Sequence, residues 1–247
     1  MMPLVLHLRS QSLHTDAVGH VSWRVDEVVQ QIDPARLAII VCDVWDHHWC
    51  RGAEERLDAM VERMNETLCA ARARGVQIIH APSETMAFYA DHPARRRIAG
   101  IVSAALPFER PHEDPLLPID DGDGGCDVVG CTPHRAWTCE HRTITIDAER
   151  DVISDVGLEV YAWLVKWGIE RTLIMGVHTN MCVLRRSFAI MQMVRWGVPI
   201  ALVRDLTDAM YNPARAPYVS HDEGTALVVS YIEQHWCPTV ASTDLIS

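Results

Sequence analysis

Along most of the chain, short apolar runs alternate with segments in which apolar residues recur at helical spacing. The alternation begins near residue 37 and continues to the end of the sequence. It is typical of a parallel sheet whose strands are joined by crossover helices. We expect strands at 37–43, 76–80, 142–146, 172–175 and 199–203, and helices at 52–74, 157–167, 180–196 and 221–234. The pattern therefore predicts an α/β fold, a three-layer α/β/α sandwich around a mostly parallel, Rossmann-like sheet.

Two stretches depart from this repeat. Residues 1–36 contain only two short strand-like runs, so we interpret them as an N-terminal arm that packs on the domain edge or on a partner subunit. Residues 37–247 then form the main domain. Within it, residues 106–141 are rich in proline and glycine, and we interpret them as an irregular insertion. A long loop of this kind in a compact α/β domain is usually functional or a lid.

The composition narrows the possible function classes. The 247 residues include 33 Asp and Glu against 22 Lys and Arg, which gives a net charge of −11 with neutral histidines. So acidic a chain argues against nucleic-acid binding and against anionic membrane surfaces. No stretch approaches the ~18 consecutive apolar residues of a membrane span. Polar residues interrupt any signal-peptide core near the N-terminus, so we expect a cytoplasmic protein whose eight cysteines are thiols.

Reactive side chains follow several of the predicted strands, where open parallel sheets bind their ligands. The segment from Gly176 to Cys182 joins a buried strand to a helix. It places the Cys182 sulfur in the first helical turn, where free N–H groups and the helix dipole favour a thiolate. The same N–H groups, from about His178 to Cys182, can form an oxyanion hole. The alternative is a buried structural thiol at a packed helix start.

A family resemblance favours the catalytic interpretation of Cys182 over the structural one. With Asp43 at the end of the first strand and the run Gly-Val-His-Thr-Asn-Met-Cys-Val at 176–183, the chain resembles the isochorismatase-like cysteine hydrolases, which include nicotinamidases, over roughly residues 37–240. Members of that family use an Asp, Lys and Cys triad. The resemblance implies that Cys182 is the nucleophile and Asp43 the proton acceptor. It also implies a cis Val177–His178 bond in the turn that includes Thr179 and helps to form the oxyanion hole.

The chain departs from the family at the lysine, because Asp155 occupies the position after the third strand where the family has that residue. The only lysine, Lys166, ends a predicted helix, where a cation facing solvent is the ordinary interpretation. An acid in place of the cation raises a thiol pKa unless another cation compensates. Asp155 could instead orient a histidine or a substrate amine. Candidate substitutes for the missing charge are His47, His48, His178, Arg185 and Arg204.

Two functions follow from these residues. The first is a cysteine hydrolase, an amidohydrolase that cleaves a small amide or related C–N bond through a Cys182 thioester. The second is a non-catalytic small-molecule binding or scaffold protein that keeps the fold without the triad. In either case we expect a small-molecule ligand and a homo-oligomer, with no nucleic-acid or membrane partner. Candidate substrate-binding residues are Trp45, His48 and Glu84.

Metal binding is a further possibility, although the thiol chemistry requires no cofactor. Nicotinamidase-type members hold a divalent metal near the first strand end, and the corresponding candidates here are His47, His48 and His80. The alternative is a polar, aromatic pocket wall. The loop residues Cys126, Cys131, His134 and Cys139 have the side-chain types of a structural zinc site without its standard spacing. The alternative there is a glycine-rich turn with incidental thiols.

Overall fold

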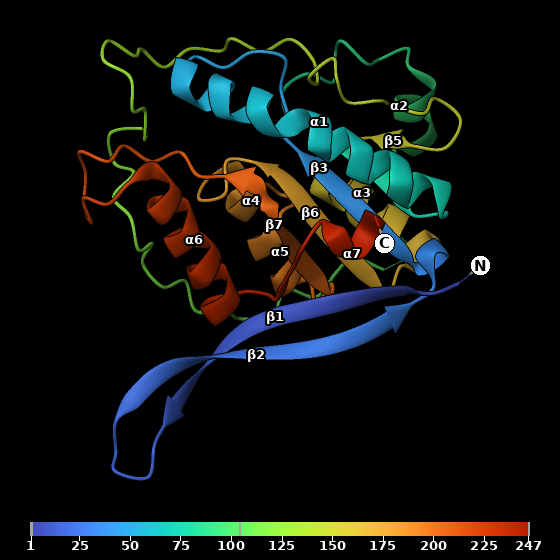
Figure 1. Ribbon diagram of the computed structural model, residues 1–247. Helices are drawn as coiled ribbons and strands as arrows, with labels where there is room; N and C mark the ends of the chain where they lie inside the picture. The colour runs from blue at the N-terminus through green and yellow to red at the C-terminus, as the bar shows by residue number, and fades with distance from the viewer. Residues whose placement is uncertain (1, 104, 247) are drawn as a thin grey trace.

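The computed structural model describes residues 2–103 and 105–246, which form one eight-stranded sheet in the order β2-β1-β8-β7-β6-β3-β4-β5 (Figure 1). The strands are β1 Leu4–Thr15, β2 Val21–Ile32, β3 Leu37–Cys42, β4 Gln77–Ala81, β5 Val152–Ile153, β6 Arg171–Val177, β7 Ile200–Asp208 and β8 Thr239–Val240. Strand β1 runs antiparallel to β2 and β8, and the remaining pairs are parallel. The predicted α/β class and mostly parallel sheet are therefore confirmed.

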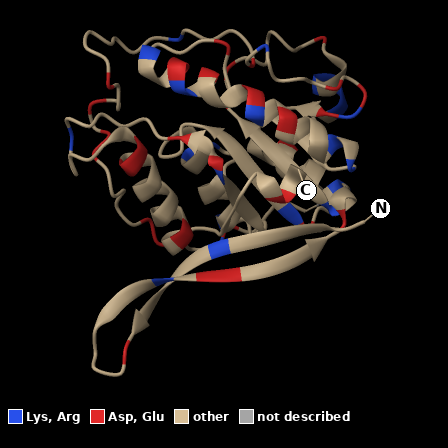
Figure 2. Cartoon of the chain, viewed as in Figure 1, with Lys and Arg blue, Asp and Glu red and all other residues tan. Residues whose placement is uncertain are grey.

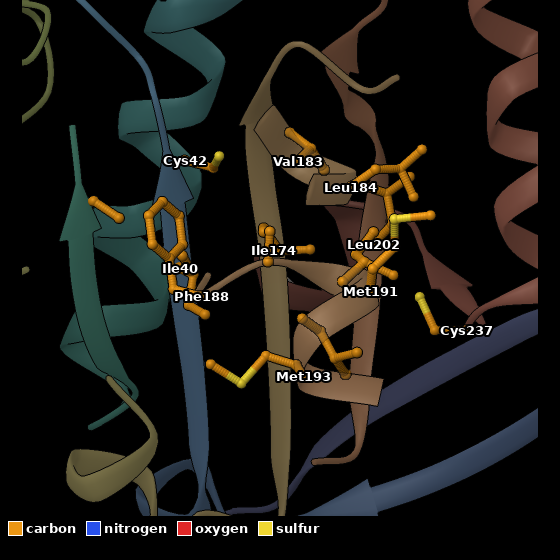
Figure 3. Close-up of a cluster of buried hydrophobic side chains, with 14 of the residues drawn as sticks. Ile40, Cys42, Ile174, Val183, Leu184, Phe188, Met191, Met193, Leu202 and Cys237 are labelled. Carbon is orange, nitrogen blue, oxygen red and sulfur yellow. The ribbon is translucent and has the colours of Figure 1, made fainter. Parts of the chain in front are cut away.

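Helices cover both faces of the sheet. They are α1 Arg51–Ala73, α2 Pro93–Ile98, α3 Gly157–Lys166, α4 Cys182–Arg185, α5 Ile190–Arg195, α6 His221–His235 and α7 Thr243–Ile246, with a 3-10 turn η1 at Pro34–Arg36. One hydrophobic cluster joins α1 and α7 to the sheet, and a second joins α3, α4, α5 and α6 to its other face. Figure 3 shows the second cluster, in which Ile40, Ile174 and Leu202 from three strands meet Phe188 and Met191. These two clusters give the three layers their core.

The expected strand at 142–146 does not exist, and this prediction is wrong. That segment is a loop that packs against α1, where Ile144 is buried and the N–H of Thr145 donates to Asn65 Oδ1 at 2.9 Å. The sheet position beside β4 is taken instead by the two residues of β5. The alternating pattern at 142–146 therefore marks one side chain facing a helix and not a strand.

The prediction of one continuous helix at 180–196 is also wrong. The chain leaves the helical conformation between α4 and α5. Arg186 is extended, with φ −60° and ψ 155°. Phe188 enters the core directly after it, and Ser187 packs against Gly157 so closely that a Cβ there would overlap the Ser187 carbonyl. The N–H of Gly157 donates to Ser187 Oγ at 3.0 Å. This break determines where the Arg186 side chain lies.

The first strands are longer than expected. β1 and β2 form one hairpin with a continuous register from Leu4↔Ile32 to Thr15↔Val21. The hairpin meets the body of the protein at its inner half, where Arg9 pairs with Thr239 of β8, and its tip extends beyond the body (Figure 1). Charged residues are sparse on it, whereas acidic and basic residues alternate along α1 (Figure 2). Residues 106–141 contain no helix or strand, apart from a single bridge between Trp45 and Glu140.

Candidate functional site

The site lies beyond the carboxyl ends of β3, β4 and β6. Asp43 follows β3, is fully buried and has a positive φ of 49°. Its Oδ1 accepts from the Ser83 N–H at 2.7 Å, and its Oδ2 accepts from Arg186 Nε at 2.9 Å. The Cys182 thiol, at the start of α4, is hydrogen-bonded to the same carboxyl group. Strand ends that meet at one edge of the sheet thus bring together a thiol, an acid and a guanidinium.

Arg186 is a site residue that the sequence analysis missed. It pairs with Asp43, its Nη1 lies 3.7 Å from Glu84 Oε1, and its guanidinium lies 5.9 Å from the Trp45 ring. A guanidinium therefore lies next to the buried Asp43 carboxyl group. The predicted continuous helix 180–196 gave no reason to single out Arg186, because this residue is extended at the end of α4 and not part of that helix.

Three of the proposed substitutes and the only lysine of the sequence lie elsewhere. Arg185 is exposed beside residues 114–122, and Arg204 contacts Thr239 Oγ1 at 3.4 Å. His47 is exposed and pairs with Glu54 at 2.9 Å. Lys166 is exposed at the end of α3, with its Nζ 5.6 Å from the Trp163 ring. None of these four cations contacts Asp43 or Cys182 in the described part of the chain.

The electrostatics of Cys182 differ from the expectation of a thiolate. Burial raises the pKa of the Cys182 thiol well above its usual range, and the negative charge of Asp43 adds to the increase. Arg186 and the His178 N–H lower the pKa of this thiol without reversing the shift. Helix α4 has only four residues, so its dipole is weak. At neutral pH the resting sulfur is therefore a protonated thiol.

Asp43 is suited to accept the thiol proton. Burial raises the pKa of Asp43, while the charge of Arg186 and the hydrogen bonds from Ser83 oppose that increase. A carboxylate whose pKa is raised is a stronger base than one in water. The hydrogen bond from Cys182 supplies the path for the proton.

The turn between β6 and α4 shapes the other side of the sulfur. The Val177–His178 bond is cis, as the resemblance implies. The N–H groups of Met181 and Val183 donate to the His178 carbonyl, at 3.0 and 3.2 Å. Among the described residues, the N–H groups of His178 and Cys182 have no oxygen acceptor, and the His178 N–H faces the Cys182 sulfur. These two groups are free to bind an oxyanion.

Thr179 and Gly176 hold this turn in place. The Thr179 N–H donates to the Asp208 carbonyl at 2.9 Å, and its Oγ1 contacts Thr207 Oγ1 at 2.7 Å. Gly176 has a φ of +121°, and a Cβ there would overlap the backbone of Cys42. Only glycine fits that position. Thr179 therefore acts on the site through the backbone, with its side chain turned to β7.

Aromatic rings form one wall of the site. Trp45 is 4% exposed and stacks on Trp137, with ring centroids 4.0 Å apart. His48 is half-buried and lies 4.8 Å from the His178 ring. Burial, with a smaller contribution from His48, lowers the pKa of His178 to about 3, so this imidazole is neutral. Trp137 was missed in the sequence analysis because it lies in the irregular segment, which carries no periodic signal.

Asp155 and Glu84 are connected to each other. Asp155 Oδ2 accepts from the Glu84 N–H at 2.9 Å, and Glu84 adopts a positive φ of 66° with its carboxylate exposed near Arg186. Among the described contacts of Asp155 there is no histidine. In this position Asp155 holds the loop after β4 and does not touch Cys182.

The candidate metal-binding residues His47, His48 and His80 do not form a common site. Burial lowers the pKa of His80, but the charges of Glu140 and Asp151, at 2.8 and 3.1 Å, outweigh this and raise it to about 9. A histidine protonated at neutral pH is no metal ligand. Within residues 2–103 and 105–246, no group of three donors contains His47, His48 or His80.

The proposed zinc quartet is corrected as well. His134 is exposed, and the Cys139 sulfur lies 3.5 Å from Asp46 Oδ2. Cys126 and Cys131 do lie together and are joined by a disulfide, so the expectation of eight free thiols fails for this pair. Their neighbour is Cys50, which is distant in the sequence and gave no spacing signal.

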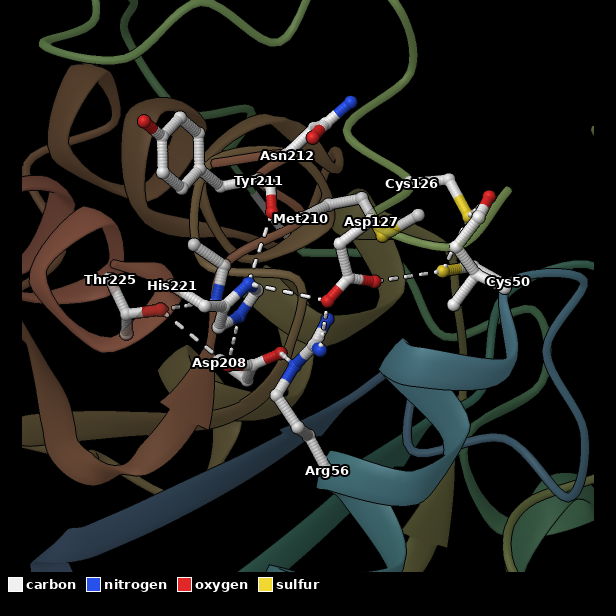
Figure 4. A network of polar contacts seen from close by, with 12 residues as sticks. Cys50, Arg56, Cys126, Asp127, Asp208, Met210, Tyr211, Asn212, His221 and Thr225 are labelled. Carbon is white, nitrogen blue, oxygen red and sulfur yellow. Dashed lines mark hydrogen bonds and ion pairs between the residues drawn. The ribbon is translucent and has the colours of Figure 1, made fainter. Parts of the chain in front are cut away.

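A polar network links these sulfurs to the end of β7 (Figure 4). Arg56 donates to Asp208 Oδ2 at 3.0 Å and to Asp127 Oδ2 at 2.6 Å. His221 contacts Asp208 Oδ1 through Nε2 at 2.9 Å and the Tyr211 carbonyl through Nδ1 at 3.0 Å. The network reaches the turn between β6 and α4, because the Asp208 carbonyl accepts from the Thr179 N–H.

Comparison with solved structures identifies the fold. Over 87% of this chain and 92% of the other, the protein is similar to a cysteine hydrolase from Pseudomonas syringae pv. phaseolicola 1448A, with a TM-score of 0.54 and 17% identity. It is also similar to an isochorismatase family protein from Burkholderia thailandensis, with a TM-score of 0.47, 11% identity, and coverage of 86% and 96%. No protein-family profile and no curated protein sequence matches it. No described helix has the length and apolarity to cross a membrane.

Proposed function

We propose that this protein is a cysteine hydrolase that cleaves a small amide or related C–N bond, with Cys182 as nucleophile, Asp43 as base and Arg186 in the place of the family lysine. The observation that carries the proposal is the arrangement of these groups: one buried carboxyl is hydrogen-bonded to the Cys182 thiol and paired with the Arg186 guanidinium at 2.9 Å. The solved cysteine hydrolase with the same fold agrees with this reaction class.

The chemistry follows from the resting protonation states. Asp43 takes the thiol proton as the Cys182 sulfur attacks the substrate carbonyl, and the N–H groups of His178 and Cys182 hold the resulting oxyanion. The C–N bond then breaks, the amine leaves with the proton from Asp43, and a thioester remains. Asp43 next deprotonates water, which attacks the thioester, and the sulfur leaves as the thiol. Arg186 keeps Asp43 ionised until the proton arrives.

The proposed substrate is small and partly planar. His48 and Trp137 are half-buried and offer ring surface on one side of the sulfur, while Trp45 supports them from within. Trp137 Nε1 is buried without a partner among the described residues, which makes it a candidate contact for a polar substrate group. Glu84, which is exposed near Arg186, is a candidate contact for a substrate amine.

The test is to trap the thioester. A panel of small amides is incubated with the protein, quenched in acid and examined by intact mass, while released amine is measured in parallel. We expect an acyl adduct that is absent from Cys182→Ala and present in the control Cys69→Ser, which alters an exposed thiol. If no amide gives an adduct or a product, and the same compounds bind Cys182→Ala as tightly as wild type, the protein is the non-catalytic binding protein.

A further inference from the structure

Three cysteine sulfurs converge outside the proposed active site. Cys50 is the N-cap of α1, whereas Cys126 and Cys131 lie in the irregular segment 106–141. The three sulfurs all lie within 4.8 Å of one another, and those of Cys50 and Cys126 are 2.8 Å apart. The proposed hydrolysis uses none of them. Their convergence joins a segment without regular structure to the start of the longest helix.

A carboxylate lies beside one sulfur of this cluster. Asp127 Oδ1 lies 3.6 Å from the Cys50 sulfur, and the other oxygen of the same carboxylate is held by Arg56 at 2.6 Å (Figure 4). The approach of Asp127 requires Gly52, because a Cβ there would overlap the carboxylate. Arg56 therefore holds the Asp127 carboxylate with one oxygen next to the Cys50 sulfur.

We propose that the reduced thiols of Cys50, Cys126 and Cys131, with Asp127 Oδ1 as the fourth donor, bind one Zn²⁺ ion that ties the irregular segment to α1. Three thiolates and one carboxylate are ligands that Zn²⁺ takes in tetrahedral sites. Soft sulfur ligands disfavour Ca²⁺ and Mg²⁺. Tetrahedral Zn–S bonds of about 2.3 Å place sulfurs about 3.8 Å apart. The Cys50 and Cys126 sulfurs lie 2.8 Å apart and those of Cys126 and Cys131 are bonded, so metal binding requires the sulfurs to move apart after reduction.

Metal binding and the Cys126–Cys131 disulfide exclude each other, because both use the same sulfurs. An external dithiol reduces the disulfide: two electrons break the S–S bond, Cys126 and Cys131 become thiols, and the dithiol becomes a disulfide. Zn²⁺ then displaces one proton from each of the three cysteine thiols.

The site has a structural role. A loop with no helix or strand gains little stability from backbone hydrogen bonds, and a metal clip that closes it supplies folding free energy. The ion would also fix Asp127 and Arg56, and through Arg56 the Asp208 carboxylate at the end of β7. The irregular segment that the clip holds carries Trp137, which stacks on Trp45. This inference does not depend on the proposed hydrolysis.

The test is a metal titration of the full-length protein, reduced with a dithiol and then freed of it under anaerobic conditions. Co²⁺ serves as the optical probe and Zn²⁺ as its competitor. We expect one equivalent of Co²⁺ with the intense d–d absorption of a tetrahedral site and a sulfur-to-metal charge-transfer band, both lost when Zn²⁺ is added. Cys50→Ser should weaken Zn²⁺ binding by about 100-fold and Asp127→Asn by about 10-fold.

Two control variants make the result specific. Cys139→Ser removes a cysteine of the quartet suggested by sequence, and Cys69→Ser removes an exposed thiol; both should bind like wild type. Circular dichroism verifies that each variant is folded. The inference is overturned if the reduced wild type binds no metal, if folded Cys50→Ser binds Zn²⁺ as tightly as wild type, or if Cys139→Ser weakens binding as much as Cys50→Ser does.

Discussion

Two groups of the same three residue types lie beyond the same edge of the sheet. In one, Cys182 contacts Asp43, which is paired with Arg186; in the other, Cys50 contacts Asp127, which is paired with Arg56. The acids differ in their exposure to water: the Asp43 side chain is 0% exposed and that of Asp127 is 19% exposed.

The difference in burial gives the two acids opposite properties. Burial raises the pKa of Asp43 despite its arginine, whereas Arg56 lowers the pKa of Asp127 despite partial burial. The first acid is prepared to take a proton from a thiol, and the second remains an anion that can coordinate a cation. The same three residue types can thus support a proton transfer or hold a fixed charge. Which of the two they are suited to depends on how much water reaches the carboxylate.

The largest expected effect separates the two cysteines. Cys182→Ala should reduce amide hydrolysis by about 10⁴-fold, because removal of a nucleophile leaves only binding and oxyanion stabilisation. Cys50→Ala should retain hydrolysis within about 10-fold, since its sulfur takes no part in the reaction. The measurement is kcat/KM with the amide found in the panel. Equal losses in both variants would break the comparison, because the sulfur cluster would then belong to the catalytic site.

The aspartates are distinguished by the pH dependence of Cys182 alkylation. In the wild type, the rate should keep rising above the ordinary thiol range, because burial and Asp43 raise the pKa of Cys182 and the thiolate is the species that reacts. Asp43→Asn removes the negative charge, so its alkylation curve should shift to lower pH while amide hydrolysis falls by about 10³-fold. Asp127→Asn is the matched control and should leave the curve in place. An Asp43→Asn curve that coincides with the wild type contradicts the assigned coupling.

The arginines are compared by stability. Arg186→Met leaves Asp43 buried without its cation and should lower the unfolding free energy by on the order of 2 kcal/mol. This is less than for a fully buried pair, because the Arg186 side chain is 30% exposed. Arg186→Lys should restore most of the stability and a measurable part of the activity. Urea unfolding measures the change in stability, and kcat/KM measures the change in activity. If Arg186→Lys restores neither the stability nor the activity, the role of Arg186 is not its charge.

The smallest effect is expected at Asp155, which the family resemblance aligns with a catalytic lysine. Asp155→Asn should change kcat/KM by less than about threefold, because an amide oxygen can still accept from the Glu84 N–H. Asp43→Asn is measured in the same assay. The two results distinguish Asp43, the proposed proton acceptor, from Asp155, which holds a loop. A loss of 100-fold or more would assign Asp155 to the reaction.

Local sequence patterns predicted the parts of the fold that depend on neighbours in the chain. Strand β3 and helices α1, α3 and α6 follow from their apolar periodicity, and Cys182 and Asp43 follow from their places at strand ends. The break after α4 could not be predicted in this way, because it results from the packing of Phe188 and of Ser187 against Gly157. As a result Arg186 was overlooked.

The sulfur cluster shows the same limit over a longer distance. Cys50 and Cys126 are separated by 76 residues, and only the folded path of the irregular segment brings their sulfurs to 2.8 Å. Spacing along the chain therefore suggested His134 and Cys139 beside Cys126 and Cys131, where the structure has Cys50. Contacts made by loops without periodicity are set by tertiary structure, and no local pattern encodes them.

We expect the tip of the N-terminal hairpin to open independently of the rest of the protein. Its last contacts with the body are the Gln11 and Trp23 side chains, which meet Glu233 and His235, and beyond them every residue to the Asp16–Gly19 turn is exposed. Amide protons there should exchange with solvent by opening of the tip alone, at a rate that does not report global unfolding. The free edge of β2 can accept a strand from a second molecule. Exchange that slows as protein concentration rises would therefore reveal self-association through this edge.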